Sequence, residues 1–167
     1  MIDVRKGVES VRIRRAVAED TDAVFALGLR TPELQVSYTA EFMGRDELVW
    51  SITKAPGVFL VAEVDGAIIG FLFASIADIE RPNDRPHSYA CLVYLVVDAP
   101  FRRSGIALQL YAACEHLLRE RGTAYVYAWA SEEGDGAVLA FADRQGFTRG
   151  HRYIWVDKQL TNDDHGK

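Results

Sequence analysis

Apolar and polar residues alternate with the period of a β-strand in the first half of the chain. Residues 11–14 read apolar, charged, apolar, charged, which is typical of a half-exposed strand. Residues 59–64 are rich in apolar side chains, and Asp65-Gly66 follows them as a hairpin turn dipeptide. We therefore expect an antiparallel return strand over residues 68–76.

A second group of strands is predicted further along the chain. Residues 89–97 are nearly unbroken apolar sequence, which favours a central strand buried on both faces. Residues 78–88 before it contain two prolines, an asparagine and several charges, and this composition predicts a loop. Shorter apolar runs predict two more strands, at residues 125–129 and 153–156.

Helical periods lie between these strands. Asp20 or Thr21 can cap the first predicted helix, and Gly122 can end the longest one in a left-handed conformation. That longest helix carries apolar side chains three or four residues apart, the spacing of a face packed on a core. The predicted helices cover residues 21–29, 46–54, 105–121 and 137–145.

This order of elements predicts an α/β fold. We expect a mixed central sheet of about six or seven strands flanked by about four helices, antiparallel at the hairpin and parallel where a helix crosses over. A chain of 167 residues has an ordinary size for one domain. Residues 11–160 are therefore expected to form a single domain, between a flexible N-terminus at residues 1–10 and a polar tail at residues 161–167.

The charge and composition argue against several classes of function. The net charge of −5 disfavours a nucleic-acid-binding protein, because that function needs a basic surface. No apolar run reaches the ~20 residues of a membrane span, and residues 1–10 lack the apolar segment of a signal peptide. Cys91 and Cys114 lie in apolar runs, without the spacing of a metal site or a disulfide framework. We therefore expect a metal-free cytoplasmic protein.

One segment has the pattern of an anion-binding site: an apolar strand, a basic turn with one glycine, and a long helix. The first turn of a helix has amide N–H groups without partners in the helix, and the helix dipole adds about half a positive charge there. Gly105 lets the backbone approach a phosphate closely, and the small Ala107 leaves the helix start uncrowded. Arg102 and Arg103 add charge and forked donors.

Two common phosphate-binding motifs do not fit this segment. A P-loop needs a second glycine followed by Lys and then Ser or Thr, and the turn has no Gly-Lys pair. A dinucleotide-binding fingerprint needs three spaced glycines near the first strand, and this turn has one. The segment therefore predicts a phosphate site of another kind.

At these residues the chain resembles the GNAT acetyltransferase family. The family's signature is Gln or Arg, two variable residues, Gly, one variable residue, and Gly or Ala, and Arg102-Arg103-Ser104-Gly105-Ile106-Ala107 fits it. The apolar run Leu95-Val96-Val97 precedes the turn as in that family, and residues 141–147 resemble its Phe-Tyr-x-x-x-Gly-Phe segment. The order of elements agrees from about Val11 to Val156, so the resemblance spans most of the chain.

The resemblance implies the GNAT acyl-CoA N-acyltransferase fold, with acetyl-CoA as co-substrate. The diphosphate of coenzyme A would lie on the amides of residues 103–107, and the pantetheine arm would pair with the backbone at Leu95 and Val97 like an added strand. The N–H of Leu95 would polarise the thioester carbonyl. The implied cofactor-binding residues are Leu95, Val96, Val97, Arg102, Arg103, Ser104, Gly105, Ile106, Ala107 and Phe141.

The chain departs from the family at the positions that transfer protons. The strand position that carries a glutamate in some members is Cys91, and the tyrosine that many members use as an acid is replaced by Ala142. The asparagine that is frequent ahead of the fourth helix becomes Asp135. Tyr94 in the central strand is then the candidate catalytic residue. Further candidates for proton transfer are Tyr125, Tyr127, Glu80, His87 and a chain of water molecules.

The implied reaction is direct attack of a neutral primary amine on the acetyl group of acetyl-CoA. The acceptor would be a small molecule, a peptide or a protein, with no nucleic-acid or membrane partner. The substitutions at Cys91 and Ala142 leave an alternative open, an acyl-CoA-binding module with little or no transferase activity. A third reading is a protein that binds some other phosphorylated ligand. A homodimer is the expected assembly, because most soluble oligomers are two-fold pairs.

Overall fold

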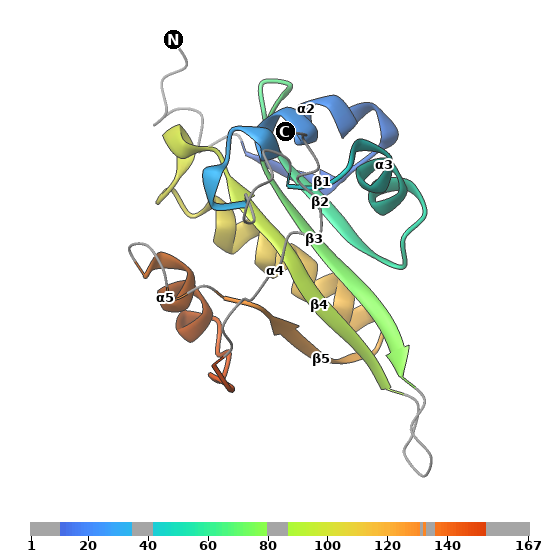
Figure 1. Cartoon of the computed structure of the whole chain (residues 1–167), viewed down its shortest axis with the longest axis vertical. Coiled ribbons are helices and arrows are strands. Elements are labelled where there is room, and N and C mark those ends of the chain that lie inside the picture. The colour runs from blue at the N-terminus through green and yellow to red at the C-terminus, as the bar shows by residue number, and fades with distance from the viewer. Residues whose placement is uncertain (1–10, 35–41, 80–86, 131, 133–135, 153–167) are drawn as a thin grey trace, which may run out of the picture. The chain divides into compact units, whose positions relative to one another are not determined.

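A mixed β-sheet forms the centre of the first of two compact units. The structure is a computed structural model that describes residues 11–34, 42–79, 87–130, 132 and 136–152, and the chain divides into two compact units, residues 1–129 and 130–167. In the first unit the described residues form a five-stranded sheet in the order β1-β2-β3-β4-β5 (Figure 1). The strands are β1 (Arg12–Arg15), β2 (Gly57–Val64), β3 (Ala67–Ile79), β4 (His87–Val97) and β5 (Thr123–Ala128).

Strand pairing follows the predicted mixed pattern. The strands from β1 to β4 pair antiparallel with their neighbours, while β4 and β5 run parallel. Asp65 and Gly66 join β2 to β3 with φ angles of 49° and 81°, the left-handed values that match a two-residue turn to the twist of its strands. The predicted α/β class and the predicted hairpin are therefore confirmed.

Helices precede, connect and follow the strands. The helix α4 (Ile106–Glu120) crosses over between the parallel strands β4 and β5, as parallel pairing requires. Gly105 and Gly122 stand at its two ends with φ angles of 86° and 78°, which glycine adopts without strain. The second unit contains α5 (Ala137–Arg144), and Gly146 follows it. The remaining helical elements are η1 (Ala18–Asp20), α2 (Thr21–Leu29), η2 (Pro32–Leu34), α3 (Arg45–Thr53) and η3 (Ala99–Phe101).

An aromatic core fills the space between one face of the sheet and the helices α2 and α3. Phe71 on β3 is fully buried, and its ring lies 6.0 Å from those of both Phe42 and Phe59. Leu27 on α2 and Leu48 on α3 belong to the same buried cluster. Burial of these large side chains supplies most of the driving force that holds the two helices on the sheet.

The opposite face of the sheet packs against α4. Gly70 on β3 points to this face, where an added Cβ would lie 3.4 Å from Leu110 of α4 and 2.8 Å from the carbonyl oxygen of Val96. The missing side chain therefore permits the close approach of helix and sheet at this point. Leu110, Cys114 and Leu118 on α4 are buried, as the helical spacing predicted. Figure 1 shows α4 passing behind β3 and β4.

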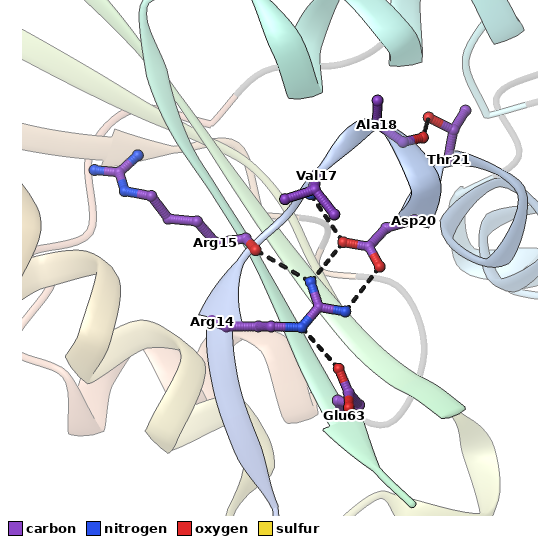
Figure 2. A network of polar contacts seen from close by, with 7 residues as sticks. All are labelled: Arg14, Arg15, Val17, Ala18, Asp20, Thr21 and Glu63. Atoms are coloured by element: carbon purple, nitrogen blue, oxygen red, sulfur yellow. Dashed lines mark hydrogen bonds and ion pairs between the residues drawn. The ribbon is translucent and has the colours of Figure 1, made fainter. Parts of the chain in front are cut away.

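A polar network fixes β1 to the start of α2 (Figure 2). The guanidinium of Arg14 donates to both carboxylate oxygens of Asp20, at 2.6 and 2.8 Å, and its Nε donates to Glu63 on β2 at 2.7 Å. Asp20 also accepts from the backbone N–H of Val17 at 2.9 Å. The Arg14 hydrogen bonds hold the pKa of the largely buried Asp20 below its usual value. The network thereby joins two strands and the segment that leads into α2.

Two expectations about the long strands were wrong. The segment between β3 and β4 is shorter than predicted, because Asp78 pairs with Ser88 and Ile79 with His87, so the strands extend into residues predicted as loop. Polar side chains do not prevent backbone pairing once two strands are held antiparallel. The strand β4 is also not buried on both faces: Val93 is exposed, and most of the other residues are half-buried. The helices α2 and α3 lie mainly over β3 and β2, and β4 reaches the core beneath them through Val96 and, in part, Tyr94.

Some predicted segments lie outside the described residues. These are the last strand at residues 153–156, the N-terminus at 1–10 and the tail at 161–167. Within the described ranges, every helix is too short or too polar to cross a lipid bilayer. The same ranges contain no cluster of His, Cys, Asp and Glu side chains suited to hold a metal ion.

Candidate functional site

The sheet opens between β4 and β5. The two strands pair from Ser88 with Thr123 to Leu92 with Ala128, and no pairing follows in the described residues. Residues 94–97 of β4 therefore pair with β3 on one side only, and β5 turns away on the other side (Figure 1). An unpaired strand edge in the middle of a sheet presents backbone donors and acceptors to any extended ligand.

A β-bulge marks the point where the sheet opens. Phe73 on β3 pairs with Tyr94, and the next residue, Ala74, pairs with Leu92. Val93 is thus an extra residue on β4, and its side chain is exposed. Bulges bend a strand and re-aim the residues that follow, and they are frequent beside active sites.

The backbone of β4 directs specific amides toward this open edge. The N–H of Asp98 donates to the carbonyl of Ile69 on β3 at 2.8 Å. Alternate residues of a strand direct their N–H groups to the same side. The N–H of Val96 therefore also points to β3, while the N–H groups of Leu95 and Val97 point to the open edge. The side chain of Val96 is buried in the aromatic core. Of the three strand residues predicted to contact a cofactor, Leu95 and Val97 are therefore the two whose N–H groups face the open edge, while the carbonyl of Val97 accepts from Arg102.

A compact turn connects β4 to α4. The Asp98 carboxylate accepts from the N–H of Ala99 at 3.0 Å and so caps the short helix η3. Phe101 is buried and anchors the turn, and the hydroxyl of Ser104 donates to its carbonyl oxygen. Arg103 and Gly105 both have left-handed φ angles, 64° and 86°. Such alternation turns successive N–H groups toward a common side and forms an anion-binding concavity.

The amides of this turn are the main polar feature of the site. Across the part of the chain that the structure describes, nothing accepts a hydrogen bond from the N–H groups of residues 103–108. The first amide of the region with a partner is that of Gln109, which donates to Gly105 at 3.1 Å. A Cβ added to Gly105 would meet no atom within 4 Å, so the space beside Gly105 itself is open. The dipole of α4 adds positive potential at the same point.

The two arginines of the turn have different surroundings. Arg102 donates from Nε to the carbonyl of Val97 at 3.1 Å and pairs with both carboxylate oxygens of Glu33, at 2.7 and 3.3 Å. These hydrogen bonds lower the pKa of Glu33. Arg103 is exposed and forms no ion pair within the described residues. Arg103 is therefore the cation that a ligand on the turn can engage without breaking an existing contact.

A second ion pair fastens the turn to the first helix. Arg30, at the end of α2, donates to the Asp98 carboxylate at 2.8 and 3.4 Å. Sequence reasoning predicted neither Asp98 nor Glu33 as part of the site. Asp98 had a local signal, since an Asp ahead of Ala99-Pro100 is typical of a helix cap. Glu33 had none, because 69 positions separate it from Arg102.

The candidate proton-transfer groups lie on β4 and β5. The hydroxyl of Tyr94 donates to the carbonyl of Phe42 at 3.0 Å, and its ring lies edge-on to that of Phe42 at 5.4 Å. Burial raises the pKa of Tyr94. Burial also raises the pKa of the Cys91 thiol, which lies opposite Tyr127 on β5. Neither group is therefore ionised near neutral pH, and neither can serve there as a general base.

The other predicted residues fall in separate places. Ile106 is buried at the start of α4, and Ala107 follows it half-buried. Phe141 and Ala142 lie on α5, in the second unit. His87 is the first residue of β4. Glu80 and Asp135 lie outside the described residues.

Comparison with known proteins assigns this arrangement to a family. A family model described as the acetyltransferase (GNAT) family matches residues 24–147, which include the open edge of β4, the turn and α4. No curated protein matches the sequence.

Solved structures with the same fold include several acetyltransferases. An aminoglycoside acetyltransferase from an uncultured soil metagenomic sample, solved with trehalose, has a TM-score of 0.72 at 18% identity, covering 92% of this chain and 98% of that one. An aminoglycoside antibiotic 6′-N-acetyltransferase from Acinetobacter baumannii has a TM-score of 0.68 at 22% identity, covering 91% and 100%. A mutant of a Bacillus halodurans protein has a TM-score of 0.76 at 15% identity, covering 89% and 99%. At these identities the likeness shows the fold alone.

Proposed function

Because the chain belongs to the GNAT acetyltransferase family, we propose that it transfers an acetyl group from acetyl-CoA to a primary amine. The observation that carries this proposal is the sequence of open backbone groups from β4 to α4. The edge of β4 offers Leu95 and Val97, and the amides of residues 103–108 follow within the same continuous segment. A ligand that carries both an extended amide-bearing arm and a diphosphate matches this order of groups.

The diphosphate of acetyl-CoA would lie on the turn. The amides of residues 103–107 would donate to its oxygens, and the dipole of α4 would stabilise its negative charge. Arg103 would add a direct charge–charge interaction. Arg102, held by Val97 and Glu33, would mainly fix the shape of the turn. Phe141 remains a proposed contact of the cofactor on α5.

The acetyl-bearing arm would lie along β4. The amides of Leu95 and Val97 would pair with the amide groups of the pantetheine, as an added strand pairs with a sheet edge. The N–H of Leu95 would donate to the thioester oxygen, where negative charge develops during attack. The bulge at Val93 would let the arm bend away from the sheet beyond this point.

The reaction exchanges a C–S bond for a C–N bond. The neutral amine attacks the thioester carbon, the C–N bond forms, and the C–S bond breaks with its electron pair on sulfur. The amine loses one proton to solvent and the thiolate gains one. Tyr94 is the proposed donor to sulfur, since its raised pKa keeps the hydroxyl protonated at neutral pH. The proposed acceptor is a small molecule, as for the neighbours described as aminoglycoside acetyltransferases, one of them solved with CoA.

A second candidate function is an acyl-CoA-binding module with little or no transferase activity. The observation in its favour is chemical: Cys91 and Ala142 replace the usual catalytic positions, and the hydroxyl of Tyr94 donates to Phe42. Under this candidate function the site for acetyl-CoA is present, while the groups that would transfer protons are missing. A homodimer and a cytoplasmic location stay predictions under either function.

Two measurements test these proposals separately. Calorimetric titration with acetyl-CoA tests the donor site, and saturable binding is expected. Release of free thiol in the presence of a panel of primary amines tests transfer, and turnover above the rate of spontaneous hydrolysis is expected. Binding without turnover would favour the module. Absence of any heat with acetyl-CoA would overturn both functions.

A further inference from the structure

Four aromatic side chains, three exposed and one half-buried, lie on and beside β5. They are Tyr89 on β4, Tyr125 and Tyr127 on β5, and Trp129 directly after β5. Tyr125, Tyr127 and Trp129 are 57%, 39% and 71% exposed. The ring of Tyr125 lies 5.8 Å from that of Tyr89 and 6.4 Å from that of Tyr127. The rings of Tyr89, Tyr125 and Tyr127 are therefore contiguous. Together with Trp129, two residues beyond Tyr127, we call them the aromatic row.

The aromatic row lies on the face of the sheet that α2 and α3 cover elsewhere. Tyr127 pairs with Cys91, Cys91 pairs with Ser75, and Ser75 is two residues from the core residue Phe73 on β3. Residues two apart on a strand share a face, so the row continues the face of the aromatic core. The helices α2 and α3 pack mainly over β3 and β2, and the exposed rings of Tyr125 and Tyr127 lie beyond them on β5.

The row ends where the sheet opens. Tyr127 and Cys91 are the last pair but one before β4 and β5 separate after Leu92 and Ala128. The Leu95 amide, the proposed contact of the thioester, lies four positions beyond Cys91. At the rise of a β-strand this places the Tyr127 position on the order of 10 Å from the reacting carbonyl. A molecule that extends from the thioester along this face toward β5 can reach the aromatic row.

The chemistry of the row favours a cation. The faces of Tyr and Trp rings attract ammonium groups through their π electrons. The strand segments that carry the row, residues 87–97 and 123–129, contain neither Lys nor Arg, and the chain has a net charge of −5. A ring surface without fixed positive charge, on an acidic protein, suits a cationic ligand.

We propose that the aromatic row holds a second ammonium group of the acceptor, so that the preferred acceptors are diamines and polyamines. This inference rests on the proposed function. One nitrogen of the acceptor is neutral and attacks the thioester, while another stays protonated over the rings of Tyr125 and Tyr127. Acceptors whose nitrogens are on the order of 10 Å apart span the two positions.

The test uses straight-chain diamines of increasing length, from a propane to a decane backbone, with monoamines of matched length. We expect kcat/KM to rise along the diamine series and to stay flat along the monoamines. Tyr125→Leu and Tyr127→Leu should each reduce the diamine preference by roughly two- to five-fold, the ratio that one exposed cation–π contact supports. Tyr125→Phe and Tyr127→Phe keep a ring and should keep the preference.

The matched control is Trp50→Leu, which removes an aromatic ring of 50% exposure from α3. It should leave the preference unchanged. Equal kcat/KM for diamines and monoamines in the wild type would overturn the inference, and so would a loss in Tyr127→Phe as large as in Tyr127→Leu. Sedimentation of the leucine variants tests another role. If they change from dimer to monomer and still prefer diamines to monoamines, the aromatic row binds a second copy of the chain and the inference fails.

Failure of the inference can be told apart from failure of the proposed function. If no amine is acetylated, the proposed function fails. The row is then tested by calorimetric titration of the octane diamine into the protein, where the wild type should bind more tightly than Tyr127→Leu. If amines are acetylated without regard to the second nitrogen, the proposed function stands and the aromatic row has no part in acceptor choice.

Discussion

Arg102 and Glu33 form a two-pronged ion pair between the turn that begins α4 and the short helix η2 that follows α2. The two N–O distances are 2.7 and 3.3 Å, and the Nε of the same guanidinium donates to the carbonyl of Val97 at 3.1 Å. Arg102 thus touches the end of β4 and the N-terminal helices at once. Its position ties the open strand edge to the open amides and leaves Arg103 directed to solvent.

Glu33→Gln should strengthen acetyl-CoA binding with little change in stability. Both partners of the pair are solvent-exposed, so the loss in the free energy of unfolding should stay below about 1 kcal/mol. Removing the carboxylate raises the positive potential at the turn, so we expect the Kd for acetyl-CoA to be roughly two- to five-fold lower than in the wild type at low salt. This difference in Kd should narrow as salt is added. Calorimetric titration at two salt concentrations measures this.

The control for this variant is Glu115→Gln, which removes one carboxylate from the Arg119 pair on α4. It should leave the Kd unchanged. Weaker acetyl-CoA binding in Glu33→Gln would show instead that the ion pair is needed to shape the turn.

Gly105→Glu should abolish binding of acetyl-CoA without unfolding the protein. The new side chain would have open space, but its carboxylate would lie among the amides proposed for the diphosphate. The left-handed φ of 86° makes a side chain there cost roughly 1 kcal/mol. Titration and thermal unfolding on one preparation separate the two effects.

Gly122→Glu is the matched partner of that variant. Gly122 has a φ of 78° and equally open surroundings, at the opposite end of α4. Its stability loss should be similar and its acetyl-CoA affinity normal. Equal loss of affinity in both glycine variants would mean that general strain, not the amide site, governs binding.

Asp20→Asn should destabilise the protein in a pH-dependent way. The Asp20 side chain is 9% exposed and accepts two bonds from Arg14, so its loss should lower the free energy of unfolding by about 2 kcal/mol near neutral pH. Because the folded pKa of Asp20 is lowered, its contribution is complete above its unfolded pKa of about 4 and falls away as pH drops through the folded value.

The difference in the free energy of unfolding between wild type and Asp20→Asn, measured with urea, should therefore shrink below about pH 4. Asp22→Asn provides the comparison, because Asp22 pairs with Arg45 but is 80% exposed. It should change stability by less than about 0.5 kcal/mol. A constant difference between wild type and Asp20→Asn across the acid range would contradict the role given to the Arg14 network.

Tyr94→Phe separates catalysis from packing. The carbonyl of Phe42 would lose its donor, which should cost about 1 kcal/mol of stability. If the hydroxyl protonates the leaving sulfur, kcat should also fall by about 100-fold while acetyl-CoA binding is retained. Since burial raises the pKa of Tyr94, wild-type kcat should lose this acid only above the usual tyrosine pKa of about 10. Unchanged kcat in the variant would restrict Tyr94 to the core.

The sequence by itself determined the elements whose cause is local. The Asp65-Gly66 turn, the helix between Gly105 and Gly122, and the strand–turn–helix unit with its open amides follow from backbone preferences that act over a few neighbouring residues. The same local pattern carried the resemblance to the family that the comparison then established.

Only the tertiary structure decided which parts of that pattern meet. Glu33 reaches Arg102 across 69 positions, β5 leaves β4 after Leu92, and the rings of the aromatic row gather on one face because two strands pair in one register. The predicted burial of β4 on both faces was wrong for the same reason. An apolar run shows what a strand can bury, whereas the placement of helices over the sheet decides what it does bury.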